Sequence, residues 1–173
     1  MAGAMQTRSL EAIVGALNTA SVRYLIVGGL AVVAHGYVRF TADLDLVLDL
    51  DSANARRAMT ALASLHYQPR APVPLEAFAD ADQRAKWVAE KGLTVFSLWS
   101  SEHAATEVDL FVEDPFDFAA AYGAATMLEI GPGIMAPFVS LADLVEMKRK
   151  AGRPADLNDI AQLQRVREGR SDG

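Results

Sequence analysis

The sequence of 173 residues contains no cysteine. This absence excludes a disulfide framework, a thiolate metal site and a thiol nucleophile, and it fits a reducing compartment. No apolar run approaches the roughly 18 residues of a membrane span, and the longest, LIVGGLAVVA, is interrupted by two glycines. The first residues lack the basic start, apolar run and cleavage site of a secretory signal. We therefore expect a cytoplasmic protein without a membrane partner.

Basic residues are scarce as well. Lys and Arg number 16 against 22 Asp and Glu, so the net charge is -6 and the pI is near 5.0. An acidic chain binds phosphate backbones poorly unless it carries a local basic patch. One candidate patch exists, made of Lys148, Arg149, Lys150, Arg153, Arg165, Arg167 and Arg170. Taken alone, these charges are better explained as a solvated helix face.

Several catalytic signatures are missing. There is no GxxxxGK[ST] segment, which excludes a P-loop. The 3 histidines are scattered without an HExxH spacing, and no serine has the setting of a nucleophile elbow. The acidic stretch from Asp43 to Asp51 lacks the central glycine and final glutamate of an EF-hand loop.

Apolar residues make up 51% of the chain, enough for a real core. Their periodicity predicts strands over residues 24–27, 44–50, 94–99, 106–112, 126–130 and 134–139. It predicts helices over residues 9–17, 30–35, 53–65, 115–121, 140–151 and 154–166, with a less certain helix over 77–90. Prolines make residues 68–75 a loop, and Pro137 should confine its strand to a sheet edge.

Strands and helices alternate, so the predicted fold class is α/β (α+β), a mixed sheet flanked by helices. We expect a core over residues 1–139 and a C-terminal helical extension over 140–173 that packs on it, together forming a single structural domain.

The most informative segment is VGGLAVVAHGYVRFTADLDLVLDLD, residues 27–51. In its strand, leucines alternate with aspartates, so Asp43 and Asp45 share one face about 7 Å apart. Like charges so close repel, and a bound cation or raised pKa values would relieve them. Paired carboxylates suit Mg²⁺, although a solvated acidic strand face is the alternative. Asp49 and Asp51, at the far end, are interpreted as turn and helix-start residues.

Gly28 and Gly29 lie between a predicted buried strand and a short helix. Glycines permit close backbone approach, and a helix start presents free N–H groups to an anion. A glycine pair alone is weak evidence. A glycine turn that leads through one short helix into an Asp-x-Asp strand is much more specific for phosphate binding.

These residues resemble the motif of the nucleotidyltransferase superfamily. The resemblance rests on Gly28-Gly29, Gly36, Arg39, Thr41 and Asp43-Leu44-Asp45-Leu46, and it is greatest to the bacterial AbiEii-type toxins and related nucleotidyltransferase-like proteins. The C-terminal segment LADLVEMKRKAGRPADLNDIAQL is also similar to that group, with a Lys, then an Arg, then Asp-x-x-Asp. The implied fold is nucleotidyltransferase-like.

The resemblance implies metal ligation and catalysis by Asp43 and Asp45, with Mg²⁺ or Mn²⁺ as cofactor. Asp109, in TEVDLFVED, matches the third carboxylate expected on a neighbouring strand, and Glu107 is a weaker candidate. The implied nucleotide-binding residues are Gly28, Gly29, Arg39, Thr41, Lys148 and Arg153. Asp156 and Asp159 should stabilise the last helix or pair with Lys148 or Arg153.

The implied activity is metal-dependent transfer of a nucleoside monophosphate from an NTP to an acceptor hydroxyl on RNA, protein or a small molecule. A toxin–antitoxin setting, with a cognate antitoxin as partner, follows from the same resemblance. Many active members carry Gly-Ser in the turn, whereas position 29 here is Gly. Two alternatives therefore stay open: a nucleotide-binding or interaction module without turnover, and a structural protein with an acidic strand face.

Overall fold

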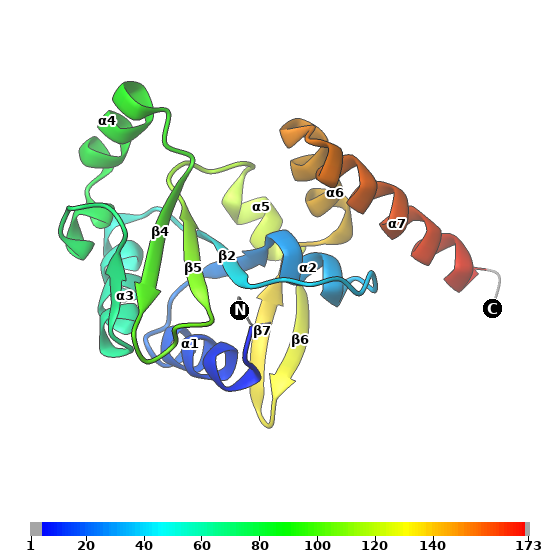
Figure 1. The fold of residues 1–173 in the computed structure, drawn as a ribbon, viewed down its shortest axis with the longest axis horizontal. Helices are drawn as coiled ribbons and strands as arrows, with labels where there is room; N and C mark the ends of the chain where they lie inside the picture. The colour runs from blue at the N-terminus through cyan, green and yellow to red at the C-terminus, as the bar shows by residue number, and fades with distance from the viewer. Residues whose placement is uncertain (1–4, 172–173) are drawn as a thin grey trace.

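The computed structural model describes residues 5–171, which form a mixed sheet with helices packed around it (Figure 1). Its strands are β1 (Tyr24–Val27), β2 (Asp43–Leu48), β3 (Tyr67–Pro69), β4 (Val95–Ser100), β5 (Glu107–Phe111), β6 (Thr126–Gly131) and β7 (Ile134–Phe138). Their spatial order is β3-β4-β5-β2-β1-β7-β6. The β2–β5 and β1–β7 pairs are parallel and the others are antiparallel. The predicted α/β class with a mixed sheet is confirmed.

The helices are α1 (Thr7–Thr19), α2 (Gly28–Ala34), α3 (Ser52–Ser64), η1 (Leu75–Ala79), α4 (Ala81–Lys91), α5 (Phe118–Gly123), α6 (Leu141–Ala151) and α7 (Pro154–Ser171). Helices α1 and α3 contact each other at the lower left of Figure 1, while α6 contacts α2 and α7 at the upper right. Within the described residues, no helix is long and apolar enough to cross a bilayer. The division into a core and a C-terminal extension stays a prediction.

Strand β2 owes its two faces to the alternation of Leu and Asp. Leu44, Leu46 and Leu48 are completely buried in the core, whereas Asp43 is exposed and Asp45 is half-buried. At the end of the strand, Asp51 caps α3 by accepting a hydrogen bond from the Asn54 N–H, and Asp49 pairs with Arg23. Both terminal aspartates are thus structural, as the sequence indicated.

Two expectations about proline were wrong. Residues 67–69 form strand β3 where a loop was expected over 68–75, and Pro69 is tolerated because β3 is an edge strand. Pro137 does not mark an edge, since β7 lies between β1 and β6. Strands β1 and β7 share one registered pair, Ile26 with Phe138, so little backbone pairing is required of β7 on that side.

Several element boundaries also differ from the expected ones. Strand β2 ends at Leu48, and α5 begins at Phe118 because the side chain of Asp117 caps it there. The less certain helix is α4, capped by Asp80 and ended by left-handed Gly92. The last helix, α7, continues to Ser171.

Candidate active site

Strands β2 and β5 bring the carboxylates together. They run parallel as neighbours, with Asp45 opposite Asp109 and Asp43 opposite Glu107. Residues directly opposite each other project from the same face of a sheet. The sequence correctly indicated that Asp109 lies on a second strand. The register of β2 and β5 shows in addition that Asp45 is the direct neighbour of Asp109.

This arrangement is electrostatically unfavourable without a counter-charge. Burial, and then the charges of Asp109 and Asp43, raise the pKa of Asp45 to about 7, although the Gly29 N–H and Lys148 act in the opposite direction. Burial also raises the pKa of Asp43 and of Asp109 above their usual range. Ser97, opposite Asp109 on β4, acts to lower the pKa of the Asp109 carboxyl group, whose Oδ1 atom is buried without a hydrogen-bond partner.

The glycine turn lies directly against this cluster. Gly28 has a φ of 65°, and a Cβ atom there would lie 2.1 Å from Oδ2 of Asp45. A Cβ atom at Gly29 would lie 2.8 Å from the hydroxyl oxygen of Thr41. The Thr41 hydroxyl in turn donates to the backbone oxygen of Asp43 over 3.3 Å. Glycine is therefore required at position 28 by the carboxylate that it contacts, before any ligand is considered.

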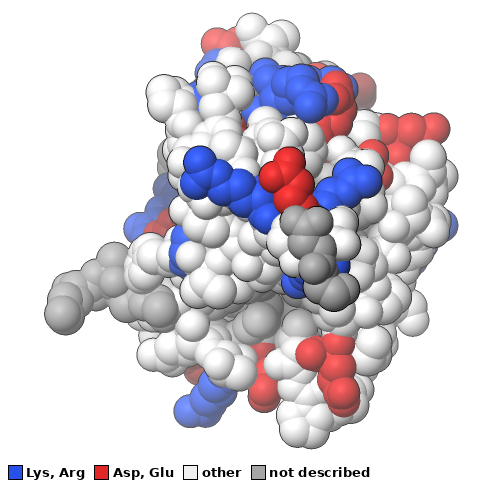
Figure 2. All heavy atoms as spheres, turned by 90° about the vertical axis from the view of Figure 1, so that its right-hand side faces the viewer, with Lys and Arg blue, Asp and Glu red and all other residues white. Residues whose placement is uncertain are grey.

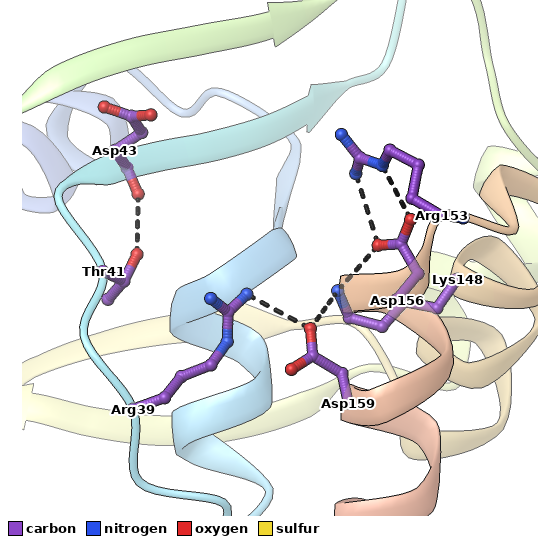
Figure 3. Close-up of polar contacts among 7 residues, drawn as sticks. All are labelled: Arg39, Thr41, Asp43, Lys148, Arg153, Asp156 and Asp159. Atoms are coloured by element: carbon purple, nitrogen blue, oxygen red, sulfur yellow. Dashed lines mark hydrogen bonds and ion pairs between the residues drawn. The ribbon is translucent and has the colours of Figure 1, made fainter.

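The expected basic residues are held in one ion-pair network (Figure 3). Lys148 of α6 lies 2.9 Å from Asp159 and 3.5 Å from Asp156. Arg39, from the segment before β2, reaches Asp159 over 3.2 Å, and Nε of Arg153 donates to Asp156 over 2.7 Å. The expected pairing of both α7 aspartates is confirmed. Lys148, Asp156 and Asp159 are each at least 93% buried and form the interior part of the network, whereas the side chain of Arg153 is 75% exposed.

The basic patch inferred from the C-terminal sequence is not continuous. Lys148 is buried, which contradicts its interpretation as part of a solvated face. Arg149 does lie on the surface, where it pairs with Glu146. On the face of the molecule at the α7 end, basic side chains are separated by acidic and uncharged ones (Figure 2). The described residues visible on this face therefore form no continuous basic platform for a phosphate backbone.

A cavity of about 540 Å³ connects these parts. It is lined by Gly28, Asp45 and Asp109 on the sheet side and by Lys148, Arg153 and Asp156 on the helix side. Asp43, at the exposed start of β2, is not among the residues that line it. A larger cavity of about 760 Å³ between α3 and η1 shares none of these residues, so its size does not make it the candidate site.

The chemistry of the cavity fits a divalent cation together with an anion. Among residues 5–171, no three or more His, Cys, Asp or Glu side chains stand ready as a metal cage. Mg²⁺ rarely needs one, because it is usually held by one or two carboxylates, water and substrate phosphates. Asp45 and Asp109 both line this cavity, and Oδ1 of Asp109 has no hydrogen-bond partner, so the two residues could supply the carboxylate ligands of such an ion.

Some residues of the site were not found from the sequence. Ser97 was discounted as a nucleophile, and its contact with Asp109 depends on the pairing of β4 with β5. Val95, Phe111 and Met147 line the cavity but carry no motif. Phe111 stands two residues after Asp109 on the same strand. Because alternate residues of a strand share a face, this spacing was the one signal in the sequence that could have placed Phe111 on the face of Asp109.

No protein-family model and no curated protein sequence matches the chain. Solved structures do. The lincosamide antibiotic adenylyltransferase LnuA, crystallised with lincomycin, is similar with a TM-score of 0.58 at 14% identity, covering 95% of this chain and 99% of LnuA. A candidate nucleotidyltransferase from Thermotoga maritima has a TM-score of 0.54 at 14% identity, covering 96% and 92%.

At this identity the likeness establishes the fold alone. The protein has a nucleotidyltransferase-like fold, which confirms the fold expected from its motifs. The narrower resemblance to AbiEii-type toxins and the roles of individual residues stay predictions.

The buried network yields a first testable prediction. Asp159→Ala removes the nearest partner of Lys148 and leaves that ammonium group with Asp156 alone. We expect the free energy of unfolding to fall by about 1–3 kcal/mol, because the buried ammonium group keeps only one of its two carboxylate partners. Glu146→Ala, which breaks the exposed pair with Arg149, should cost under about 0.5 kcal/mol. Urea unfolding of both variants measures the difference, and equal losses would contradict the burial argument.

The carboxylate cluster yields a second prediction. Asp45 has a pKa of about 7 in the folded protein against the usual 3.8. Between these values the folded state binds the proton that the unfolded chain has released, so stability falls as pH rises from about 4 to 7. Asp45→Asn mimics the protonated form. In EDTA it should match the parent at pH 4 and be more stable by about 1–3 kcal/mol at pH 8.

The measurement is urea unfolding at both pH values. A variant that is less stable than the parent at pH 8 would show that Asp45 is not under charge repulsion in the folded protein.

Proposed function

We propose that this protein is a metal-dependent nucleotidyltransferase that moves a nucleoside monophosphate from an NTP to an acceptor hydroxyl. The observation that carries the proposal is the pairing of Asp45 with Asp109 along a cavity whose other wall holds Lys148 and Arg153. Carboxylates attract a cation and basic groups attract phosphate, so one cavity suits a metal–triphosphate. The nucleotidyltransferase-like fold supports this proposal.

The carboxylates would hold Mg²⁺ or Mn²⁺, with Asp43 contributing from the exposed start of β2. A cation at this point supplies charge neutralisation at the phosphate oxygens and lowers the pKa of a coordinated hydroxyl. Two features of the chain support binding here. The pKa values of all three carboxyl groups are raised, and Oδ1 of Asp109 has no hydrogen-bond partner. A cation would relieve both.

The basic residues would bind the triphosphate. Lys148 and Arg153 line the cavity and would exchange part of their pairing with Asp156 and Asp159 for phosphate oxygens. Arg39 and Thr41 lie against the glycine turn, where they brace the turn or reach the terminal phosphates. Little chemistry is needed from these groups, because positioning and charge neutralisation account for most of the acceleration in phosphoryl transfer.

Asp109 would act as the general base. Burial raises the pKa of its carboxyl group, which makes its anion a better proton acceptor near neutral pH. It would take the proton of the acceptor hydroxyl as that oxygen attacks the α-phosphorus. The bond from the α-phosphorus to the bridging oxygen then breaks, and pyrophosphate leaves with the displaced electron pair.

The acceptor hydroxyl belongs to a small molecule, an RNA or a protein. A neighbour in fold is an adenylyltransferase of a lincosamide antibiotic, a small molecule, whereas the sequence resemblance to AbiEii-type toxins leaves RNA and protein open. The toxin–antitoxin setting, with a cognate antitoxin as partner, rests on that resemblance alone.

A ligand-stabilisation experiment tests the proposal. Mg²⁺ with ATP, CTP, GTP or UTP at about 100 times Kd should raise Tm by about 5–10 °C, because the ligand binds only the folded state. Asp43→Asn combined with Asp45→Asn should abolish that shift and leave the fold intact. Asp49→Asn is the matched control, since Asp49 belongs to the same Asp-Leu alternation but pairs with Arg23.

If the double variant binds Mg²⁺–NTP as tightly as the parent, the assignment of the site is wrong. Pyrophosphate release in the presence of acceptors then separates the enzyme from the inactive module, which binds the nucleotide without releasing pyrophosphate.

The missing serine at position 29 leads to a further prediction. The Thr41 hydroxyl lies 2.8 Å from where a Cβ atom of residue 29 would stand, so it occupies the space of a serine side chain. Thr41→Ala should therefore slow pyrophosphate release about tenfold or more. Gly29→Ser alone should be equally impaired, because its side chain collides with Thr41. The double variant, Gly29→Ser with Thr41→Ala, transfers the hydroxyl from position 41 to position 29 and should recover most of the activity.

Double-mutant-cycle analysis of pyrophosphate release gives the coupling between the two positions. Full activity of Thr41→Ala would exclude a part for this hydroxyl in turnover.

A further inference from the structure

The two edges of the sheet differ in how well they are protected against pairing with another strand. One edge is β3, which has only 3 residues, contains Pro69 and is followed by Arg70. Short length, proline and charge are features by which edge strands avoid such pairing. The other edge is β6, which has 6 residues and no proline. Among residues 5–171 no strand pairs with its outer side, and the β6–β7 hairpin extends away from α6 and α7 (Figure 1).

The single charged residue of β6 does not protect this edge. Glu129 accepts a hydrogen bond from the N–H of Gly133 over 2.8 Å, so its carboxylate is directed to the turn of its own hairpin. On the same face of the hairpin, Met127 is 53% and Met135 is 42% exposed. On the other face, Leu128 is only partly buried against the core. Both faces of the edge therefore expose apolar surface that a further strand would cover.

Pro137 indicates which backbone groups of β6 point outward. The N–H of Val139 donates to the backbone oxygen of Ile26 in β1, and alternate residues of a strand direct their N–H groups to the same side. Position 137 therefore faces β1, and Met127, which is opposite Pro137, forms no hydrogen bonds with it. The same alternation applies to Glu129, two residues further along β6. The N–H and C=O groups of Met127 and Glu129 thus point away from β7, toward the free edge.

We propose that β6 is a dimerisation edge, where β6 of a second copy pairs antiparallel about a two-fold axis at Leu128. In this register Met127 lies opposite Glu129 of the second copy, and the reverse, so the outward groups of both strands all form hydrogen bonds. An axis at Glu129 would place two carboxylates opposite each other, which is unfavourable. An axis at Met127 would leave Glu129 opposite Ala125, outside the strand.

The edge is therefore complementary to itself, which favours a second copy over a strand of another protein. The protected edge at β3 prevents further pairing, so the assembly closes at two copies and does not continue into a filament. The dimer leaves the candidate active site accessible, because none of the residues that line the 540 Å³ cavity belongs to β6 or β7. The inference is thus independent of the proposed function.

The absence of cysteine permits a direct test of the register. Leu128 would face its own copy in a pair without hydrogen bonds, in which the Cα atoms are about 4.5 Å apart, within reach of a disulfide. Oxidised Leu128→Cys should therefore form a covalent dimer on a non-reducing gel. It should form about tenfold faster or more than with Leu157→Cys, because the dimer raises the effective concentration of the second thiol. Leu157, on α7, is the control because it is 54% exposed and distant in sequence from β6.

Sedimentation equilibrium tests the role of the outward backbone groups. The parent should show a monomer–dimer equilibrium at about 1–100 µM, the range expected of a small interface. Met127→Pro removes an N–H that β7 does not use, so the fold should remain and dimerisation should weaken about tenfold or more. Met127→Leu, which keeps both the N–H and the apolar side chain, should dimerise as the parent does.

A charge at position 127 tests which residue lies opposite. Met127→Glu would face Glu129 of the second copy, and dimerisation should weaken about threefold or more, since like charges directly opposite each other repel. Met127→Lys would face the same carboxylate and should dimerise at least as tightly as the parent.

The proposal is refuted if the parent stays monomeric, and a strand of another protein is then the alternative occupant of the edge. A folded Met127→Pro variant that dimerises as the parent does would exclude β6 as the interface. Equal weakening by Met127→Glu and Met127→Lys would contradict the register. If circular dichroism shows that Met127→Pro is unfolded, Leu128→Cys decides, and cross-linking no faster than that of Leu157→Cys would overturn the dimer.

Discussion

The repulsion between Asp45 and Asp109 is the constraint around which this site is arranged. The two carboxylates are direct neighbours on parallel strands, and burial leaves little water to screen them. Several neighbours reduce the stress: Gly28 has no side chain, and the Gly29 N–H, Ser97 and Lys148 each act to lower the pKa of one of the two carboxyl groups. A fold selected only for stability would not keep such a pair, because apolar residues would satisfy the sheet better.

The ion-pair network of α7 extends the same logic to the basic residues. Three cations, Arg39, Lys148 and Arg153, share the two carboxylates of Asp156 and Asp159, which leaves one net positive charge. The side chains are therefore ordered before a ligand arrives, so little rotamer entropy is lost on binding. Asp159 also connects the segment before β2 to the C-terminal helices (Figure 3). The fold thus fixes the distance between the two walls of the cavity.

Local pattern was enough to predict the faces of β2 and the turn at Gly28, whereas the carboxylate on a second strand was expected from the resemblance to nucleotidyltransferases. It could not predict which residues face each other, because register depends on pairing between distant segments. The pairing of Asp109 with Asp45, the contact of Ser97 and the place of Phe111 all depend on it. The prediction that Pro137 lies on an edge strand was wrong for the same reason. The sequence shows that Pro137 has no N–H group, but only the fold shows whether a neighbouring strand needs that group for pairing. Arg39 and Asp159 are 120 positions apart, and no periodicity connects them.

The strand order brings together groups from segments that are far apart in the sequence. Gly28 follows β1, Asp45 lies on β2 and Asp109 on β5, and these strands are neighbours in the order β5-β2-β1, while Lys148 and Arg153 line the same cavity from the helix side. The acidic groups of the site differ in how far the protein compensates them. Glu107 is paired with Arg70, and Lys148 acts on Asp45, whereas Asp43 is exposed and forms no ion pair among residues 5–171. The carboxylates are therefore only partly neutralised by the chain itself, which is why a bound cation would stabilise this part of the fold.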